Sequence, residues 1–216
     1  YKYKGVIRKI YAKLEYYNFS GSIKDRIAYY ILNNAKEKGI LKEGQPIIEA
    51  TSGNTGIAFA ALGALYNHPV HIFLPDWVSV ERRKILELYG ANIHLVSKND
   101  GFQGAIKMAD ELAQKINGFR PNQFNNHDNV LAHFYTTAEE IIKYVPDISI
   151  FVSGIGTGGT LIGVGKRLKE YNSNIRIVAL EPDKMALLSG GEMSSHKIEG
   201  IGDDFIPSIV DKKLID

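Results

Sequence analysis

The sequence contains no cysteine among its 216 residues. A disulfide framework, a thiolate metal site and a cysteine nucleophile are therefore excluded as bases for its fold or its chemistry. The six histidines, at positions 68, 71, 94, 127, 133 and 196, lack the spacing of zinc ligands. We therefore expect no metal site.

Long apolar runs are also missing. No run approaches the roughly 20 residues of a membrane span, and no signal peptide is visible. Charge of one sign is not in excess either, because the formal net charge is +2 and no basic block occurs. We therefore expect a cytoplasmic protein with neither a membrane nor a nucleic acid as partner.

Short apolar runs alternate with longer helical patterns along the chain. Strands are predicted at residues 10–14, 46–50, 70–74, 93–96, 148–152 and 175–180. Helices are predicted at 22–38, 56–66, 79–89, 101–116, 129–144 and 160–171. This alternation predicts an α/β fold, with parallel strands and helices on both faces of the sheet.

Lys24 lies just inside a predicted helix, behind a Ser-Gly-Ser turn. The dipole at a helix start disfavours positive charge, and burial lowers the pKa of an amine further. A neutral amine is what a Schiff base with an aldehyde requires. Taken alone, the pattern favours the alternative, a solvated lysine on an amphipathic helix. Two glycine-rich loops further along the chain favour the functional interpretation.

The first of these loops, EATSGNTG at residues 49–56, joins a buried strand to a helix. Six residues of this loop supply three hydroxyls, one amide and two glycines. Such a turn presents backbone N–H groups and the positive end of a helix to an anion, and a carboxylate fits as well as a phosphate. The alternative is an ordinary helix N-cap with turn residues.

The second loop, SGIGTGGT at residues 153–160, follows an apolar strand and opens the next helix. Its glycines allow a ligand to approach the backbone, and its N–H groups and threonine hydroxyls can cradle a phosphate. The spacing G-x-G-x-x-G begins at Gly154, so dinucleotide binding is an alternative. Glu181 would then be the acidic residue that contacts the ribose.

The segments KLEYYNFSGSIKDR (13–26), EATSGNTG and GIGTGGT together resemble the pyridoxal-phosphate enzymes of the cysteine synthase and cystathionine β-synthase family. The resemblance continues through residues 74–83, 90–91, 122–125, 133–137, 181–182 and 188–191. It implies fold type II, the tryptophan synthase β-like architecture. In this fold, two three-layer αβα domains with mostly parallel sheets hold pyridoxal 5′-phosphate (PLP) in the cleft between them. The smaller domain would cover residues 18–124, and the larger 1–17 plus 125–216.

The resemblance also implies roles for individual residues. Lys24 would form the Schiff base with the cofactor and then act as the base for the α-proton, and Asn54 would contact the 3′-oxygen of the cofactor. The phosphate would be held by Gly156, Thr157, Gly158, Gly159 and Thr160, and the substrate carboxylate by Thr51, Ser52, Gly53, Thr55 and Gln123. The substrate would be a small amino acid such as cysteine, serine or O-acetylserine, and the enzyme a homodimer.

Two segments of the family are absent from this sequence. One is the N-terminal Gly-Asn-Thr-Pro-Leu, and the other carries the serine or threonine that faces the pyridine nitrogen. We therefore expect a chain that is incomplete at both ends. The residue facing the pyridine nitrogen stays unassigned.

Residues 200–207, GIGDDFIP, depart from the family in an informative way. Cysteine synthases have small uncharged residues at positions 203 and 204, whereas cystathionine β-synthases have Tyr-Asp. A carboxylate at position 203 can activate water, bind an amine-bearing co-substrate, or lie solvated in a turn.

We predict PLP-dependent β-elimination or β-replacement, in which Asp203 is the general base for water. Cysteine and water would then give serine and hydrogen sulfide. The alternatives are cysteine synthesis from O-acetylserine and sulfide, and a condensation like that of cystathionine β-synthase. Outside this class stand a nucleotide-binding Rossmann domain and a non-catalytic regulator that binds PLP.

Overall fold

The computed structural model describes residues 2–216, and it begins with a short hairpin of β1 (Lys2–Tyr3) and β2 (Val6–Ile7). Residues 10–14, predicted as a strand, form no regular element, so that prediction is wrong. Their apolar side chains are exposed, and no strand of the described residues lies beside them. A β-favouring sequence needs a partner strand to bond its backbone.

Ion pairs hold the segment that follows this hairpin. Lys13 Nζ lies 2.7 Å from Glu15 in the short helix η1 (Glu15–Tyr17), and Arg26 Nε donates to the same carboxylate at 2.7 Å. Both cations also pair with Glu140. Burial raises the pKa of Glu15, but hydrogen bonds from Arg26 and Lys13 outweigh it and lower that pKa to about 2.

The first sheet is parallel, with the strand order β3 (Ile47–Ala50), β4 (Val70–Pro75) and β5 (Asn92–Val96). Alternate side chains of each strand point to opposite faces. One face packs against α2 (Asn54–Tyr66) and α3 (Val80–Leu88), and α1 (Lys24–Glu37) packs against α2 in the same core. The other face packs against α4 (Gly101–Ile116). The predicted parallel α/β organisation is confirmed.

The second sheet is a parallel pair of β6 (Ile150–Gly154) and β7 (Arg176–Leu180), packed against α7 (Gly159–Tyr171). The predicted helix 129–144 is continuous, but it has three parts: α5 (Asp128–Ala132), the π-helix η2 (His133–Thr137) and α6 (Ala138–Tyr144). Two single turns, η3 (Asp183–Met185) and η4 (Lys212–Leu214), follow β7.

Gly163 allows α7 to pack tightly against the helix of residues 128–144. A Cβ at this position would lie 2.3 Å from the carbonyl oxygen of Val130 and 2.8 Å from Cβ of His133. Only glycine permits such an approach of two helix backbones. This contact fixes the N-terminal end of α7, and with it the glycine-rich loop that precedes the helix.

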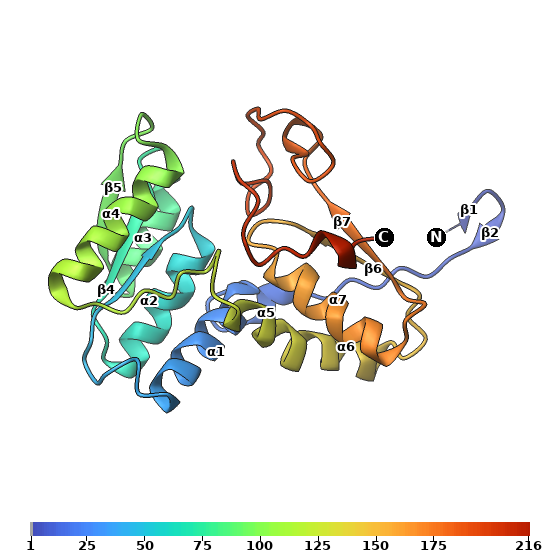
Figure 1. Cartoon of the computed structure of the whole chain (residues 1–216), viewed down its shortest axis with the longest axis horizontal. Helices are drawn as coiled ribbons and strands as arrows, with labels where there is room; N and C mark the ends of the chain where they lie inside the picture. Colours follow the sequence, from blue (N-terminus) through green and yellow to red (C-terminus); the bar gives the residue numbers. More distant parts are fainter. Residues whose placement is uncertain (1) are drawn as a thin grey trace.

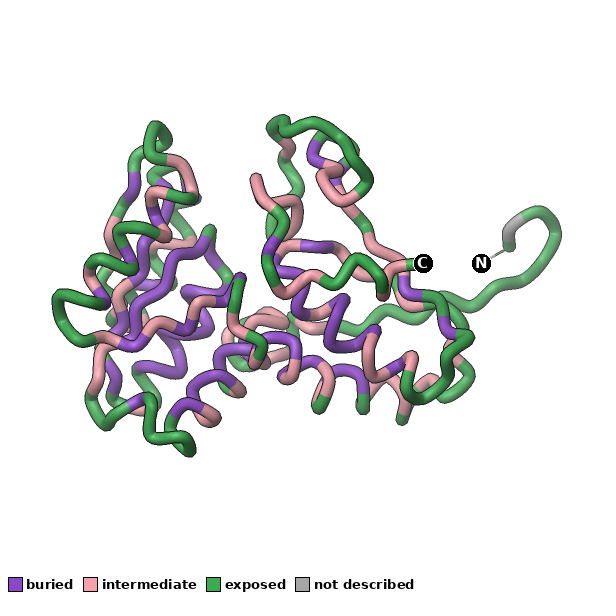
Figure 2. The backbone as a smooth tube through the Cα atoms, viewed as in Figure 1, coloured by how far each residue is buried: buried purple, intermediate pink, exposed green. Residues whose placement is uncertain are grey.

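The helices and strands form two groups. Figure 1 places α2, α3 and α4 around β4 and β5 on one side of the molecule, and α6 and α7 beside β6 and β7 on the other. Between them lie α1 and α5, joined by a 2.7 Å hydrogen bond from Asn34 to Asp128. Buried residues line the interior of each group (Figure 2).

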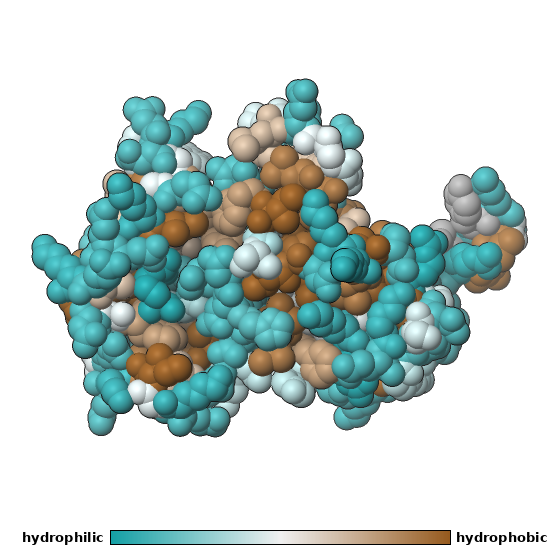
Figure 3. Space-filling model, viewed as in Figure 1, coloured by the Kyte–Doolittle hydropathy of each residue, from teal (hydrophilic) through white to brown (hydrophobic). Residues whose placement is uncertain are grey.

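Apolar side chains are exposed at several places on the surface. Val6 and Ile7 of the hairpin are exposed, and Figure 3 shows hydrophobic residues both around the middle of the molecule and on the projecting N-terminal end. The helices formed by residues 2–216 include none with the length and apolar character of a membrane span.

Candidate active site

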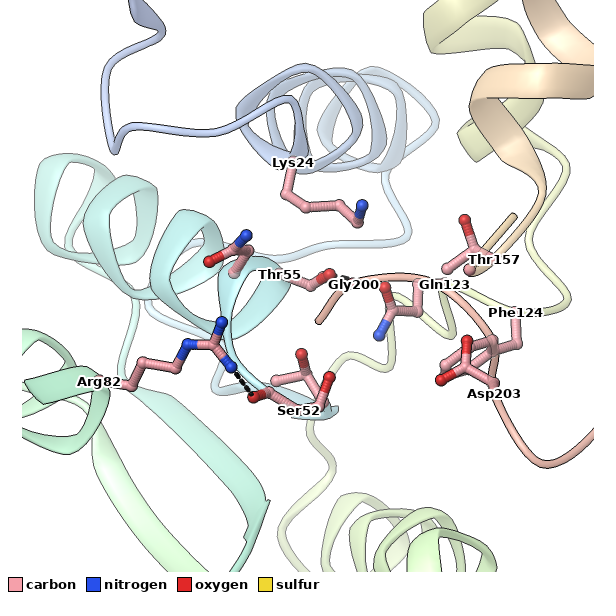
Figure 4. Close-up of a pocket in the computed structure, with 12 residues that line it drawn as sticks. Lys24, Ser52, Thr55, Arg82, Gln123, Phe124, Thr157, Gly200 and Asp203 are labelled. Atoms are coloured by element: carbon pink, nitrogen blue, oxygen red, sulfur yellow. Dashed lines mark hydrogen bonds between the residues drawn. The ribbon is translucent and has the colours of Figure 1, made fainter. Parts of the chain in front are cut away.

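A hollow of about 450 Å³, open to solvent, lies between the two groups of elements. Its walls come from residues far apart in the sequence, which the fold brings together (Figure 4). The predicted site residues that line it are Lys24, Thr51, Ser52, Asn54, Thr55, Gln123, Gly156, Thr157 and Asp203. Gly53, Gly158, Gly159 and Thr160 belong to the same two loops but are not among the lining residues.

Lys24 is the first residue of α1, and its side chain points from the helix into the hollow (Figure 4). Burial lowers the pKa of Lys24, and the negative charge of Asp203 opposes this shift. A helix start and a desolvated environment both favour the neutral amine. The amine is therefore suited to nucleophilic or proton-accepting chemistry.

The loop of residues 51–55 connects the end of β3 to the start of α2. Gly53 N–H donates to Thr51 Oγ1 at 3.1 Å, and Thr55 Oγ1 donates to Gln123 Oε1 at 2.7 Å. The Gln123 amide nitrogen in turn donates to the Ala50 carbonyl at 3.2 Å. These bonds join Gln123 to the loop, so the two form one wall of the hollow.

A buried ion pair supports this wall. Glu49 is 1% exposed, and its carboxylate accepts hydrogen bonds from Arg120 Nη1 at 2.7 Å and from the Gln123 backbone N–H at 3.2 Å. Sequence reasoning missed both Glu49 and Arg120. The available signal was a glutamate within an apolar predicted strand, residues 46–50, because a carboxylate that is buried needs a charged or hydrogen-bonding partner.

The loop of residues 156–160 leads into the N-terminus of α7. Gly158 has a φ of +85°, and a Cβ at Gly159 would lie 1.9 Å from Asn129 Oδ1. The Asn129 amide nitrogen donates to Thr157 Oγ1 at 3.0 Å, while its buried Oδ1 has no hydrogen-bond partner among residues 2–216. Asn129 packs against Gly159 where any larger residue would clash. The loop thus offers the N–H groups of a helix N-terminus and threonine hydroxyls as donors.

His133 links the π-helix to the second loop. Its Nε2 lies 3.1 Å from Thr160 Oγ1, and its Nδ1 lies 2.9 Å from Thr137 Oγ1. Burial lowers the pKa of His133 to about 3, and the charges of Lys24 and Arg26 act in the same direction. The ring is therefore neutral at pH 7. In the sequence it reads as an ordinary histidine, and its link to Thr160 was not predicted.

Asp203 lies where the first hollow meets a second one of about 260 Å³. The second hollow is lined by Ile155, Gly156, Glu181, Met185, Leu187, Leu188, Gly202, Asp203, Phe205, Ile206 and Pro207. Burial raises the pKa of Asp203 to about 6 and Asp204 adds to the shift, while Lys24 and His196 oppose it. A carboxylate that gains and loses its proton near neutrality is suited to proton transfer.

Glu181 is engaged within its own loop. Its carboxylate accepts from the backbone N–H of Leu188 at 2.7 Å and from the Ser189 N–H at 3.1 Å, and the Ser189 hydroxyl donates to it at 2.8 Å. In the Rossmann alternative, this carboxylate would bind the ribose of a dinucleotide. Its oxygens already accept these three hydrogen bonds. The geometry thus gives no support to the Rossmann alternative.

A family model described as "Pyridoxal-phosphate dependent enzyme" matches residues 3–216 of this chain. The chain belongs to this family. The predicted family, fold class and cofactor are therefore confirmed, and the protein is a PLP-dependent enzyme.

Three relatives of this PLP-dependent enzyme carry different activities in their names. A cysteine synthase of Flavobacterium sp. is 43% identical over 210 residues, which cover 96% of this chain and 68% of the relative. A hydrogen sulfide-producing enzyme from Fusobacterium nucleatum is 48% identical, with a TM-score of 0.95 over 100% of this chain and 66% of that one. An O-acetylserine-dependent cystathionine β-synthase from Helicobacter pylori is 39% identical, with a TM-score of 0.87 over 91% and 65%. The chain thus spans about two thirds of each relative's length.

The donor groups of the hollow fit PLP by their chemistry. Residues 156–160 offer a helix N-terminus with glycines and hydroxyls, which suits a dianionic phosphate. Lys24 offers an amine with a lowered pKa, which suits an aldehyde. The 51–55 loop lies across the same hollow and offers a second set of donors, which suits a carboxylate.

Proposed function

We propose that this PLP-dependent enzyme converts L-cysteine and water to L-serine and hydrogen sulfide. In the net reaction the Cβ–S bond of cysteine breaks and a Cβ–O bond to water forms, and the protons of the thiol and of water leave with the sulfide and the serine hydroxyl. The observation that carries the proposal is Asp203, a carboxylate with a pKa of about 6 that lines the same hollow as Lys24.

The binding roles follow from the two loops. We propose that Gly156, Thr157, Gly158, Gly159 and Thr160 hold the phosphate of PLP, that Asn54 contacts its ring oxygen, and that Lys24 is its attachment point. Thr51, Ser52, Gly53, Thr55 and Gln123 would hold the substrate carboxylate. When bound, PLP supplies an electron sink for negative charge at the substrate Cα. Each loop leads into a helix N-terminus, which supports an anion-binding role for both loops, one for the phosphate and one for the carboxylate.

Proton transfer is assigned to the two titratable groups of the hollow. With its lowered pKa, Lys24 takes the α-proton of the substrate as general base. Asp203, ionised above about pH 6, accepts a proton from water as the water attacks Cβ. A solved relative supports a role for an aspartate: an aspartate-to-asparagine variant of a hydrogen sulfide-producing enzyme is complexed with an α-aminoacrylate intermediate.

The test is Asp203→Asn in the PLP-loaded enzyme, with Asp204→Asn as the matched control. We expect sulfide release from cysteine to fall about 100-fold, the size of a general-base contribution. The visible absorbance of bound PLP should stay unchanged. At pH 8, where Asp203 is ionised with or without the charge of Asp204, Asp204→Asn should retain most of its activity, because Asp204 does not line the hollow. Unchanged sulfide release in Asp203→Asn would refute the role of this carboxylate.

Cysteine synthesis is the second candidate, because the Flavobacterium relative carries that name at 43% identity. Turnover of cysteine alone, measured beside turnover of O-acetylserine plus sulfide, separates the two. Condensation of the cystathionine type would instead require a thiol amino acid. We favour water as the nucleophile because Asp203 places a carboxylate with a pKa of about 6 in the hollow that Lys24 also lines.

We further propose that residues 18–124 form the smaller domain and that residues 1–17 with 125–216 form the larger one. A homodimer in the cytoplasm is proposed as the working form of the enzyme. The exposed side chains of Ile7, Ile10, Tyr11 and Leu14 support an association surface near the N-terminal segment.

A further inference from the structure

Arg82 lines the hollow, but the chemistry proposed above gives it no role. It belongs to the first turn of α3. Among the described residues around the hollow, the basic side chains are Lys24 and Arg82. Figure 4 shows the Arg82 side chain directed at the 51–55 loop, with a dashed line to Ser52.

The Arg82 side chain lies against the loop. Its Nη1 donates to the Ser52 carbonyl at 3.1 Å. A Cβ at Gly53 would lie 2.8 Å from Arg82 Cδ and 3.0 Å from its Nε, so the guanidinium packs where glycine leaves space. A planar guanidinium can pack in this way and still direct separate donors at two acceptors.

The second acceptor of Arg82 is Glu199, which pairs with Nη2. Glu199 immediately precedes Gly200 and lies four residues before Asp203, in the segment that closes the opposite wall. The Glu199 side chain is 69% exposed, so the pair itself adds little to stability. Its effect is geometric, because one side chain connects α3, the 51–55 loop and the Asp203 segment.

We propose that Arg82 is a positioning residue, which holds the 51–55 loop in the shape that accepts the substrate carboxylate and ties it to the segment carrying Asp203. The inference rests on the carboxylate site proposed above. Removing the guanidinium leaves the Ser52 carbonyl without this donor and opens space above Gly53. Small displacements of binding donors have large effects on binding and rate.

The test measures binding of glycine to the PLP-loaded enzyme through the change in cofactor absorbance. Glycine has a carboxylate but no leaving group, so the measurement does not depend on sulfide release. We expect Arg82→Gln to weaken glycine binding about tenfold, the effect of losing a hydrogen bond from a charged group. Glu199→Gln should weaken it only about twofold, because the contact with Ser52 remains.

Arg83→Gln is the matched control, because Arg83 follows Arg82 on α3 and donates to the Asp76 carbonyl instead. Its glycine affinity should equal that of the unaltered enzyme. Arg82→Lys keeps the positive charge on a single amine. Its affinity for glycine should lie between that of Arg82→Gln and that of the unaltered enzyme.

Methylamine serves as the second ligand, because it has an amine but no carboxylate. All variants should bind it equally. Unchanged glycine binding in both Arg82 variants, or equal losses for glycine and methylamine, would overturn the inference. Loss of the water-activating role of Asp203 would leave these binding results unchanged, so the two proposals fail separately.

Discussion

At the scale of single residues, Lys24 and Asp203 influence each other's protonation within one hollow. Burial lowers the pKa of Lys24 and raises that of Asp203, and each charge opposes the shift of the other group. The shared environment thus moves an amine and a carboxyl, which ordinarily titrate far apart, toward neutral pH. Both groups can then exchange protons with a substrate under mild conditions.

The pH dependence of sulfide release follows from Asp203. The pKa of its carboxyl in the folded protein is about 6, above the ordinary value of 3.8, so the protonated form dominates below pH 6. General-base activity therefore falls as the pH decreases through about 6. We expect kcat for cysteine turnover, measured across pH 5–8, to decrease as the pH falls through about 6. If Asp203→Asn showed the same decrease in kcat below pH 6, the decrease would have to come from a group other than Asp203.

Local signals made some site residues predictable. Lys24, Asn54 and parts of the two glycine loops, which the structure brings to one hollow, stand in short segments whose composition predicts anion-binding turns. Arg82 was missed because its partner Glu199 lies 117 positions away, and Arg120 because Glu49 lies 71 positions away. A charged side chain looks the same in a sequence whether it is solvated or paired, so only the fold distinguishes these cases.

At the scale of elements, periodicity located most helices and strands to within a few residues. It predicted one helix over residues 129–144, but the π-turn at His133–Thr137 changes a single hydrogen-bond register and leaves no trace in the apolar pattern. The predicted strand 10–14 failed for another reason. Its composition is suitable, but strand formation depends on a neighbour that local sequence does not specify.

The contact between α7 and the 128–144 helix provides a stability test. Gly163→Ala would place a methyl group 2.3 Å from the Val130 carbonyl, and the helices must separate to admit it. We expect a loss of about 2 kcal/mol in the free energy of unfolding, typical of overpacking. Urea denaturation measures it, and Glu170→Ala on the exposed side of α7 is the control. Equal stability of the two variants would contradict the tight contact.

At the scale of the whole molecule, the hollow draws its walls from both groups of elements. A ligand bound there contacts the 51–55 loop of one group and the 156–160 loop of the other. Binding therefore joins the two groups, and its free energy adds to the stability of their arrangement. The sequence predicted the parallel sheets, but the relative placement of two sheets depends on contacts such as Asn34–Asp128 that span the chain.

Cofactor removal tests this coupling. PLP at 100 times its dissociation constant should stabilise the protein by about 2.7 kcal/mol relative to the cofactor-free form. We expect the Tm of cofactor-free protein to rise with added PLP, and to rise less with pyridoxine 5′-phosphate, which has the phosphate but no aldehyde. Pyridoxal without phosphate should have the smallest effect. A larger shift with pyridoxal than with pyridoxine phosphate would contradict the phosphate role of residues 156–160.

Ion pairs hold the segment of residues 7–19 to the rest of the molecule, while much of its apolar surface is exposed to solvent. Glu15 pairs with Lys13 and Arg26, whereas Ile7, Ile10, Tyr11, Leu14, Tyr16, Tyr17 and Phe19 are all more than half exposed. Added sodium sulfate would screen the ion pairs and at the same time favour contact between apolar surfaces. One stretch of chain thus responds to ionic strength in two opposing directions, loosening its own attachment while promoting association with other molecules.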